Sequence, residues 1–213
     1  MADEFAGVAE SVNEIANSSA LEHVLEHIFL SELLQEAWFL RGRVVDVLHT
    51  SVDAFGYDVA LEMNGIVRHV QLKGRRKTGK TSSYKISQLL GERKSGCVVV
   101  MLWERNPETD RIDMAYRWFG GAPGEQLPNL GDKIAKHSKG DASGNKNERN
   151  AIRVVGLGSF DKPCGIGDLL DKLFGPAAVK VYSTVGAEAV AGQPSNRRRR
   201  RECAPSAPVV SDG

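Results

Sequence analysis

Three polar side chains meet at the open end of a predicted β-hairpin. Its two alternating runs, within residues 56–73, flank an Asn-Gly pair at 64–65. This dipeptide favours a two-residue turn because both central positions need a positive φ. The turn places Asp58 opposite Gln71, with Lys73 two residues further along the same face. Directly opposed Cβ atoms lie about 5 Å apart, so a carboxylate, an amide and an ammonium group can share one ligand.

The two faces of this hairpin differ in polarity. The polar face also carries Glu62 and His69. The other face is apolar and is expected to be buried; it holds Tyr57, Val59, Leu61, Met63, Ile66, Val70 and Leu72. Antiparallel sheets commonly leave one face in water. Spacing alone therefore leaves two interpretations of the polar face open, a solvated surface and a binding or catalytic site.

A family resemblance favours the site. Asp58 followed by Gln71-Leu72-Lys73 resembles the core motif of the PD-(D/E)xK nuclease superfamily, which has the restriction-endonuclease-like fold. The glutamine in place of the usual acid resembles the Mrr-like branch, whereas residues 56–58 read Gly-Tyr-Asp where the superfamily has Pro-Asp. The segments 95–100 and 116–121 also resemble uncharacterised bacterial members. The resemblance covers residues 21–175 and implies an α/β fold, in which helices on both faces flank a mixed sheet with a central hairpin.

The resemblance also implies an activity, which is metal-dependent hydrolysis of DNA phosphodiester bonds by an endonuclease of restriction, defence or repair. Glu32 and Asp58 would bind Mg²⁺ or Mn²⁺. The carbonyl of Leu72 and the amide oxygen of Gln71 would add neutral ligands, and Lys73 would orient the attacking water. Because Gln71 replaces an acid, we expect weaker metal binding and one ion rather than two.

In this superfamily a glutamate of the first helix reaches over the sheet to the metal ion, and Glu32 is the residue predicted for that role. Residues 21–40 predict a helix with an apolar stripe of Leu21, Leu25 and Ile28. Glu32 falls within that stripe, where a lone carboxylate is costly unless it is paired or bound to a metal. Glu26 and Glu36 are the alternatives.

The remaining pattern predicts one domain. We expect strands at 43–49, 97–103, 111–118 and 152–155, and helices at 81–92 and 167–174. We expect three regions along the chain: an N-terminal arm at 1–19, a nuclease-like domain at 20–176, and a disordered basic tail at 177–213 that contains Arg197–Arg201. No apolar run is long enough to span a bilayer. Three widely spaced cysteines fit a reducing cytoplasm.

Charge indicates a nucleic-acid partner. The net charge is only +1, yet residues 68–94 hold nine Lys or Arg against the single acid Glu92. Phosphate backbones bind such segments, although a solvated basic face is the plain alternative. DNA is the expected partner, bound by a monomer or a homodimer, with backbone contacts from Arg75, Arg76, Lys77, Lys80 and Lys85.

Three other interpretations are considered. The nuclease fold could serve as a catalytically inactive module that binds nucleic acid or protein. Gly74–Thr81, GRRKTGKT, matches the phosphate-binding loop of nucleotide-binding proteins, which requires a strand before it and a helix after it. His23–His27, HVLEH, matches a zinc-peptidase pattern but lacks a convincing third ligand.

Overall fold

The computed structural model describes residues 18–50, 55–137 and 147–176. Nearly all of the predicted arm lies outside these residues, as does the predicted tail with Arg197–Arg201. The described chain is of the α/β class, with a mixed sheet of five strands and a second, antiparallel sheet of three strands. No described helix is long and apolar enough to cross a membrane.

The five-stranded sheet has the order β1-β2-β3-β5-β6. Only β3 and β5 run parallel, and the other neighbours are antiparallel. Its strands are β1 (Asp46–His49), β2 (Val59–Met63), β3 (Ile66–Arg76), β5 (Gly96–Arg105) and β6 (Ile112–Gly120). The three-stranded sheet consists of β4 (Ser83–Ser87), β8 (Glu148–Gly156) and β7 (Ile134–Lys136).

The predicted hairpin is confirmed, with its register. Met63 pairs with Ile66 and Ala60 with His69. Asn64 and Gly65 have φ values of 53° and 79°, as a two-residue turn of this kind requires. The strands predicted at 43–49, 97–103, 111–118 and 152–155 are also present as β1, β5, β6 and β8, with ends shifted by a few residues.

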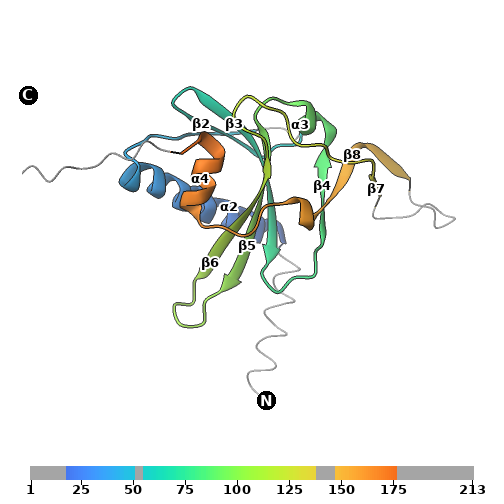
Figure 1. The fold of residues 1–213 in the computed structure, drawn as a ribbon. Coiled ribbons are helices and arrows are strands. Elements are labelled where there is room, and N and C mark those ends of the chain that lie inside the picture. Colours follow the sequence, from blue (N-terminus) through green and yellow to red (C-terminus); the bar gives the residue numbers. More distant parts are fainter. Residues whose placement is uncertain (1–17, 51–54, 138–146, 177–213) are drawn as a thin grey trace, which may run out of the picture. The chain divides into compact units, whose positions relative to one another are not determined.

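Different layers cover the two faces of the five-stranded sheet (Figure 1). One face is covered by α2 (Ser18–Gln35), which continues as the π-helical turn η1 (Glu36–Leu40), and by α4 (Ile166–Phe174). The prediction of helices on both faces holds only in part, because a short helix and a second sheet share the other face. There the three-stranded sheet and α3 (Gln88–Glu92) supply Tyr84, Ile86 and Leu90 to a second core cluster. Because β5 lies between two apolar layers, its residues 96–103 are all buried.

The helix predicted at 81–92 is the main error in secondary structure. The structure has β4 at Ser83–Ser87, and only the short α3 follows. Tyr84 and Ile86 are buried whereas Lys85 is exposed, which is the period-2 pattern of a strand. This also removes the basis of the phosphate-binding-loop interpretation. That loop must lead into a helix, and here the segment Gly74–Thr81 is followed by a strand.

A buried arginine joins the middle of the sheet to α4. The Arg68 side chain of β3 is fully buried, and it donates four hydrogen bonds to backbone carbonyl groups. Two of these carbonyls belong to Leu173 and Lys172 near the end of α4, and the other two to Gly121 and Ala122 after β6. Its guanidinium carbon lies 5.1 Å from the centre of the Trp118 ring. Arg68 is therefore a structural residue and no part of an exposed basic surface.

We expect Arg68→Ala to lower the free energy of unfolding by at least about 3 kcal/mol, because it leaves several buried carbonyl groups without donors. Urea denaturation followed by circular dichroism would measure the loss. Arg111→Ala is the matched control, since Arg111 is exposed, and it should change the free energy by less than about 0.5 kcal/mol. Equal effects of the two substitutions would contradict the prediction.

Candidate functional site

Asp58 lies just before β2 and bonds to β3 through both backbone and side chain. Its backbone N–H donates to the carbonyl of Val70 at 2.9 Å. Its carboxylate Oδ2 accepts from the backbone N–H of Leu72 at 2.6 Å. The side chain thus takes the place that a further β2 residue would occupy in the ladder. A charge-assisted hydrogen bond of this kind fixes the orientation of the carboxylate.

A cleft of about 580 Å³ lies beside this carboxylate, between α2 and the end of β3. Its acidic and basic lining residues are Glu22, His23, Glu26, Asp58 and Lys73. Gly74 lets the helix approach, because a Cβ added there would lie 3.0 Å from Cδ1 of the buried Leu25. The structure therefore brings Asp58 and Lys73 to one cleft, together with two carboxylates of α2.

Gln71 has a different environment from its neighbours in the motif. Its side chain is only 8% exposed, and it is not among the residues that line the cleft. Its Oε1 is buried and accepts no hydrogen bond from the described part of the chain. Leu72 and Lys73 do line the cleft. The three motif residues are thus adjacent, but only two of them face the same space.

The structure places Glu32 away from this cleft. Glu32 Oε2 accepts a hydrogen bond of 2.7 Å from the hydroxyl of Tyr116, which is fully buried. Burial raises the pKa of Tyr116, and the bond to Glu32 raises it further. The predicted stripe is displaced, because the helix buries Leu25, Phe29, Leu30 and Leu33. Glu32 consequently lies beside the stripe and satisfies a buried phenol.

The two alternative glutamates of the helix, Glu26 and Glu36, lie in different environments. Glu26 lines the cleft, and its Oε1 lies 3.2 Å from Nδ1 of His49. Glu36 instead pairs with Arg41, whose Nε lies 3.1 Å from its Oε1. Of the three predicted helix glutamates, Glu26 is therefore the one that shares a cleft with Asp58, and Glu22 of the same helix also lines it.

The donor set of the cleft fits a hard, mostly hydrated cation. Within the described residues no group of three or more His, Cys, Asp or Glu side chains is close enough to hold a metal ion. A zinc site of the structural kind needs such a cage. Mg²⁺ needs only one or two carboxylates and takes its other ligands from water and phosphate. Asp58 and Glu26 supply carboxylates of that kind.

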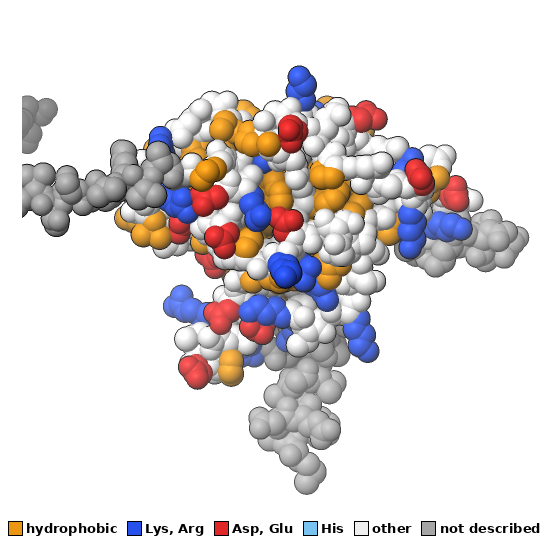
Figure 2. All heavy atoms as spheres, viewed as in Figure 1, with side chains coloured by type: hydrophobic (Ala, Val, Ile, Leu, Met, Phe, Trp, Pro, Cys, Tyr) orange, Lys and Arg blue, Asp and Glu red, His pale blue; other side chains and the backbone are white. Residues whose placement is uncertain are grey.

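The five predicted backbone-binding residues are not equally available. Arg75 donates to the carbonyl of Gly79 at 2.7 Å, Arg76 lies over the Trp103 ring at 5.2 Å, and Lys77 pairs with Glu104. In Figure 2, basic and acidic side chains are mixed at the lower end of the molecule, where Figure 1 shows the β5–β6 hairpin. The side chains of Lys80 and Lys85 are exposed and take part in no hydrogen bond or ion pair with the described residues.

Sequence reasoning missed one further group, which we call the aromatic–guanidinium cluster: Phe55, Tyr57, His69 and Arg93. The Tyr57 and His69 rings meet edge to face at 4.9 Å. Arg93 lies over the rings of Phe55 and Tyr57 and contacts His69. Tyr57 was predicted on the face of Val59, but it packs against the opposite core cluster. The Gly at position 56 was the available signal of a change in direction.

Comparison with known proteins gives no relative of this chain. No family model matches it, and neither a curated protein nor a solved structure is similar enough to count as a match. The chemistry of the cleft therefore has to be argued from its own geometry.

The environment of His69 predicts a pH dependence of stability. Arg93 Nη1 lies 3.2 Å from His69 Nε2, and since an arginine can only donate, that nitrogen must accept. Burial and the charge of Arg93 lower the pKa of His69 below its ordinary value. The folded state then binds fewer protons than the unfolded state as the pH falls below about 6.5. This contribution to stability is present above that pH and is lost below it.

We therefore expect the free energy of unfolding to fall between pH 7.5 and 5, and His69→Gln to reduce the fall. Glutamine keeps an acceptor for Arg93 and does not titrate. Urea denaturation at several pH values would measure both slopes. His27→Gln, at an exposed position of α2, should leave the slope as in the wild type. An unchanged slope in His69→Gln would refute the assignment.

Proposed function

We propose that this protein is a metal-dependent DNA endonuclease with a restriction-endonuclease-like arrangement of its core. The observation that carries the proposal is the cleft shared by Asp58 and Lys73. The carboxylate of Asp58 is fixed by the backbone of Leu72, the residue between Gln71 and Lys73. An oriented carboxylate beside an ammonium group is an arrangement suited to a phosphodiester substrate with its charge-balancing ion.

Asp58 and Glu26 would hold Mg²⁺ or Mn²⁺ in this cleft. The N–H and C=O groups of one strand residue point to the same edge, so the Leu72 carbonyl faces the edge at which Asp58 binds and would add a neutral ligand. When bound, such an ion polarises the phosphate and lowers the pKa of an attacking water. Glu26 takes the role predicted for Glu32, because it is the one of the three predicted helix glutamates, Glu26, Glu32 and Glu36, that lines the cleft.

Lys73 would act on the phosphate directly. It is half-buried, and it projects into the cleft that Asp58 lines. An ammonium group held there would orient the water and offset the negative charge that builds up on the phosphate in the transition state. Lys80 and Lys85 would contact the backbone of the DNA. Arg75, Arg76 and Lys77 would add less, since each already has a partner within the chain.

A module that binds DNA without cutting it is the second candidate. Two observations favour it: Gln71 stands where the superfamily has an acid, with its side chain outside the cleft lining, and no cluster of three ligating side chains occurs among the described residues. A module of this kind would bind DNA equally well with and without Mg²⁺ and would tolerate the loss of Asp58.

The nuclease proposal predicts cleavage of supercoiled plasmid in Mg²⁺ or Mn²⁺. Asp58→Asn and Lys73→Met should each reduce nicking by about 100-fold or more, because each removes a charge that acts on the reacting phosphate. Glu32→Gln is the matched control. It neutralises a carboxylate that lies outside the cleft and should leave nicking within a few-fold of the wild type.

Circular dichroism would establish that all three variants are folded. Absence of cleavage by the wild type on every form of DNA would favour the binding module. Cleavage that survives in both Asp58→Asn and Lys73→Met would place the chemistry elsewhere in the chain.

The nuclease proposal also predicts binding of a metal ion. Titration with Mn²⁺, followed by calorimetry, should show one weakly bound ion, and Asp58→Asn should abolish it. Two tightly bound ions in the wild type would contradict the prediction. Binding that persists in Asp58→Asn would do the same.

A further inference from the structure

A tight turn before Asp58 directs two aromatic side chains to the face of the sheet that α2 does not cover. Gly56 is buried with a φ of 75°, and a Cβ added there would lie 2.4 Å from the Cβ of Ser87. The residues on either side of this glycine therefore leave the alternation of β2. Tyr57 packs against the core cluster that contains Tyr84 and Leu90. Phe55 emerges at the surface, where 48% of the residue remains exposed.

Arg93 fixes these rings in place. Its guanidinium carbon lies 4.8 Å from the centre of the Phe55 ring and 5.1 Å from that of Tyr57. The two rings lie 6.4 Å apart with an angle of 22° between their planes. His69 holds the group from the protein side through its contacts with Tyr57 and Arg93. The result is an oriented aromatic ring, backed by a cation and open to solvent.

Phe55 makes no contribution to either core. It belongs to neither of the two buried clusters, whereas Tyr57 packs against one of them. An exposed ring held next to a guanidinium group is suited to stacking against another flat ring. Nucleic-acid bases stack on aromatic side chains with about 1–3 kcal/mol for each base, and arginine adds cation–π attraction.

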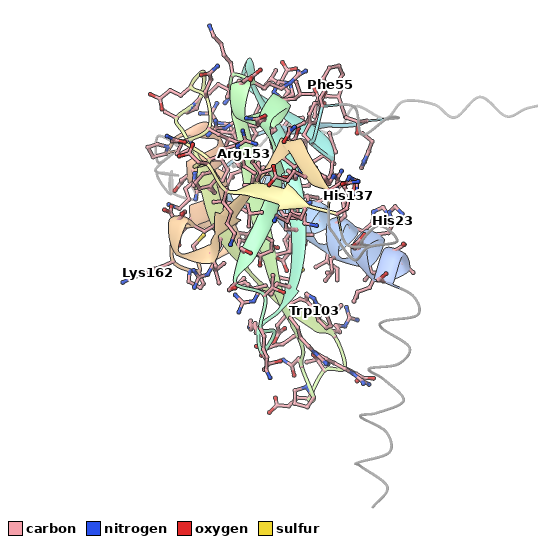
Figure 3. All side chains as sticks on the ribbon, turned by 90° about the vertical axis from the view of Figure 1, so that its right-hand side faces the viewer. His23, Phe55, Trp103, His137, Arg153 and Lys162 are labelled. Atoms are coloured by element: carbon pink, nitrogen blue, oxygen red, sulfur yellow. The ribbon has the colours of Figure 1, made fainter. Side chains whose placement is uncertain are left out.

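Charge and position favour a nucleic-acid strand over an apolar peptide as the occupant. The cluster itself contains the guanidinium group of Arg93, and the next residue in the chain, Lys94, is exposed. Phe55 precedes Asp58 by three residues, so their Cα atoms lie at most about 11 Å apart. That length corresponds to about three stacked nucleotides at ~3.4 Å each. In Figure 3, Phe55 lies near the top of the view and the cleft residue His23 lies below it, toward the right.

We propose that the aromatic–guanidinium cluster stacks an unpaired base of a DNA strand whose phosphate enters the Asp58 cleft. Single-stranded DNA, or the unpaired end of a duplex, is then the substrate class. A fully paired duplex keeps its bases inside the stack and cannot present one to Phe55. As a statement about substrate the inference rests on the proposed nuclease activity, but the stacking itself does not need a metal ion or cleavage.

Binding without divalent metal tests the stacking alone. The probe is a fluorescein-labelled single-stranded oligodeoxynucleotide, titrated in EDTA at low salt and followed by anisotropy. Phe55→Ala should weaken binding by about tenfold or more, the equivalent of one lost stacked base. Phe55→Trp should restore it. Phe39→Ala is the matched control, because Phe39 is a phenylalanine of η1 that is 73% exposed, and it should bind as the wild type does.

Two further ligands identify what Phe55 touches. An oligonucleotide with abasic sites keeps the backbone and removes the bases, so Phe55→Ala and the wild type should bind it equally. A long blunt-ended duplex, in which every base is paired, should likewise show no difference between the two proteins. The proposal is overturned if the wild type does not bind the single strand, if Phe55→Ala binds it as tightly as the wild type, or if the loss is as large with the abasic strand.

Failure of the nuclease proposal would look different. In that case the wild type would cleave no DNA in Mg²⁺, yet Phe55→Ala would still lose affinity for the single strand in EDTA. Conversely, cleavage that depends on Asp58 with no effect of Phe55 on binding would sustain the nuclease and remove the stacking site.

Discussion

The buried guanidinium of Arg68 is the constraint on which the relation between sheet and helices depends. An arginine inside a core is tolerated only when its donors are satisfied, because burial of an unpaired charge is very costly. Burial lowers the pKa of Arg68, and four backbone carbonyl groups compensate for the lost water. Two of them stand at the C-terminal end of α4, where the helix dipole is negative. The position of β3 and that of α4 are thereby fixed to each other.

This fixed β3 is longer than its neighbour β2, and the difference in length creates the site. β2 begins at Val59, opposite Val70, whereas β3 continues to Arg76. Beyond Val70, one edge of β3 has no strand of the described chain beside it, and the carboxylate of Asp58 binds the first N–H there. The cleft forms along this open edge because Gly74 permits the close approach of Leu25. The short turn at Gly56, which precedes β2, also directs Phe55 and Tyr57 to the opposite layer.

Features that depend on local periodicity were predictable from the sequence. The hairpin register follows from its turn, and the doubly buried β5 follows from an unbroken apolar run. Features that change when a helix or strand pattern shifts by one residue were not predictable from the sequence. A helix stripe displaced by one position moves Glu32 from the core face to the phenol of Tyr116. The strand β4 is only five residues long, so its alternation of Tyr84 and Ile86 was too brief to be separated from a helix.

Other parts of the site required tertiary information. Nothing local distinguishes Arg68 from its basic neighbours except its place in the alternation with Val70 and Leu72, which set it on the buried face. The choice of Glu26 over Glu36 depends on where α4 offers Asp171 to Arg41, more than 100 residues further along the chain. Arg93 could not be linked to Phe55 before the turn at Gly56 was known.

The pairing of β4 with β8 has a consequence for folding while the chain is being synthesised on the ribosome. β4 is made early, but its partner begins at Glu148, after β5 and β6 are complete. Until then Tyr84 and Ile86 have no strand across from them, and the face of β5 that they cover stays uncapped. An unpaired strand next to bare apolar surface is the kind of intermediate that aggregates or recruits chaperones. The late-synthesised strand β8 thus protects β4 and the apolar face of β5, which were synthesised long before it, from aggregation.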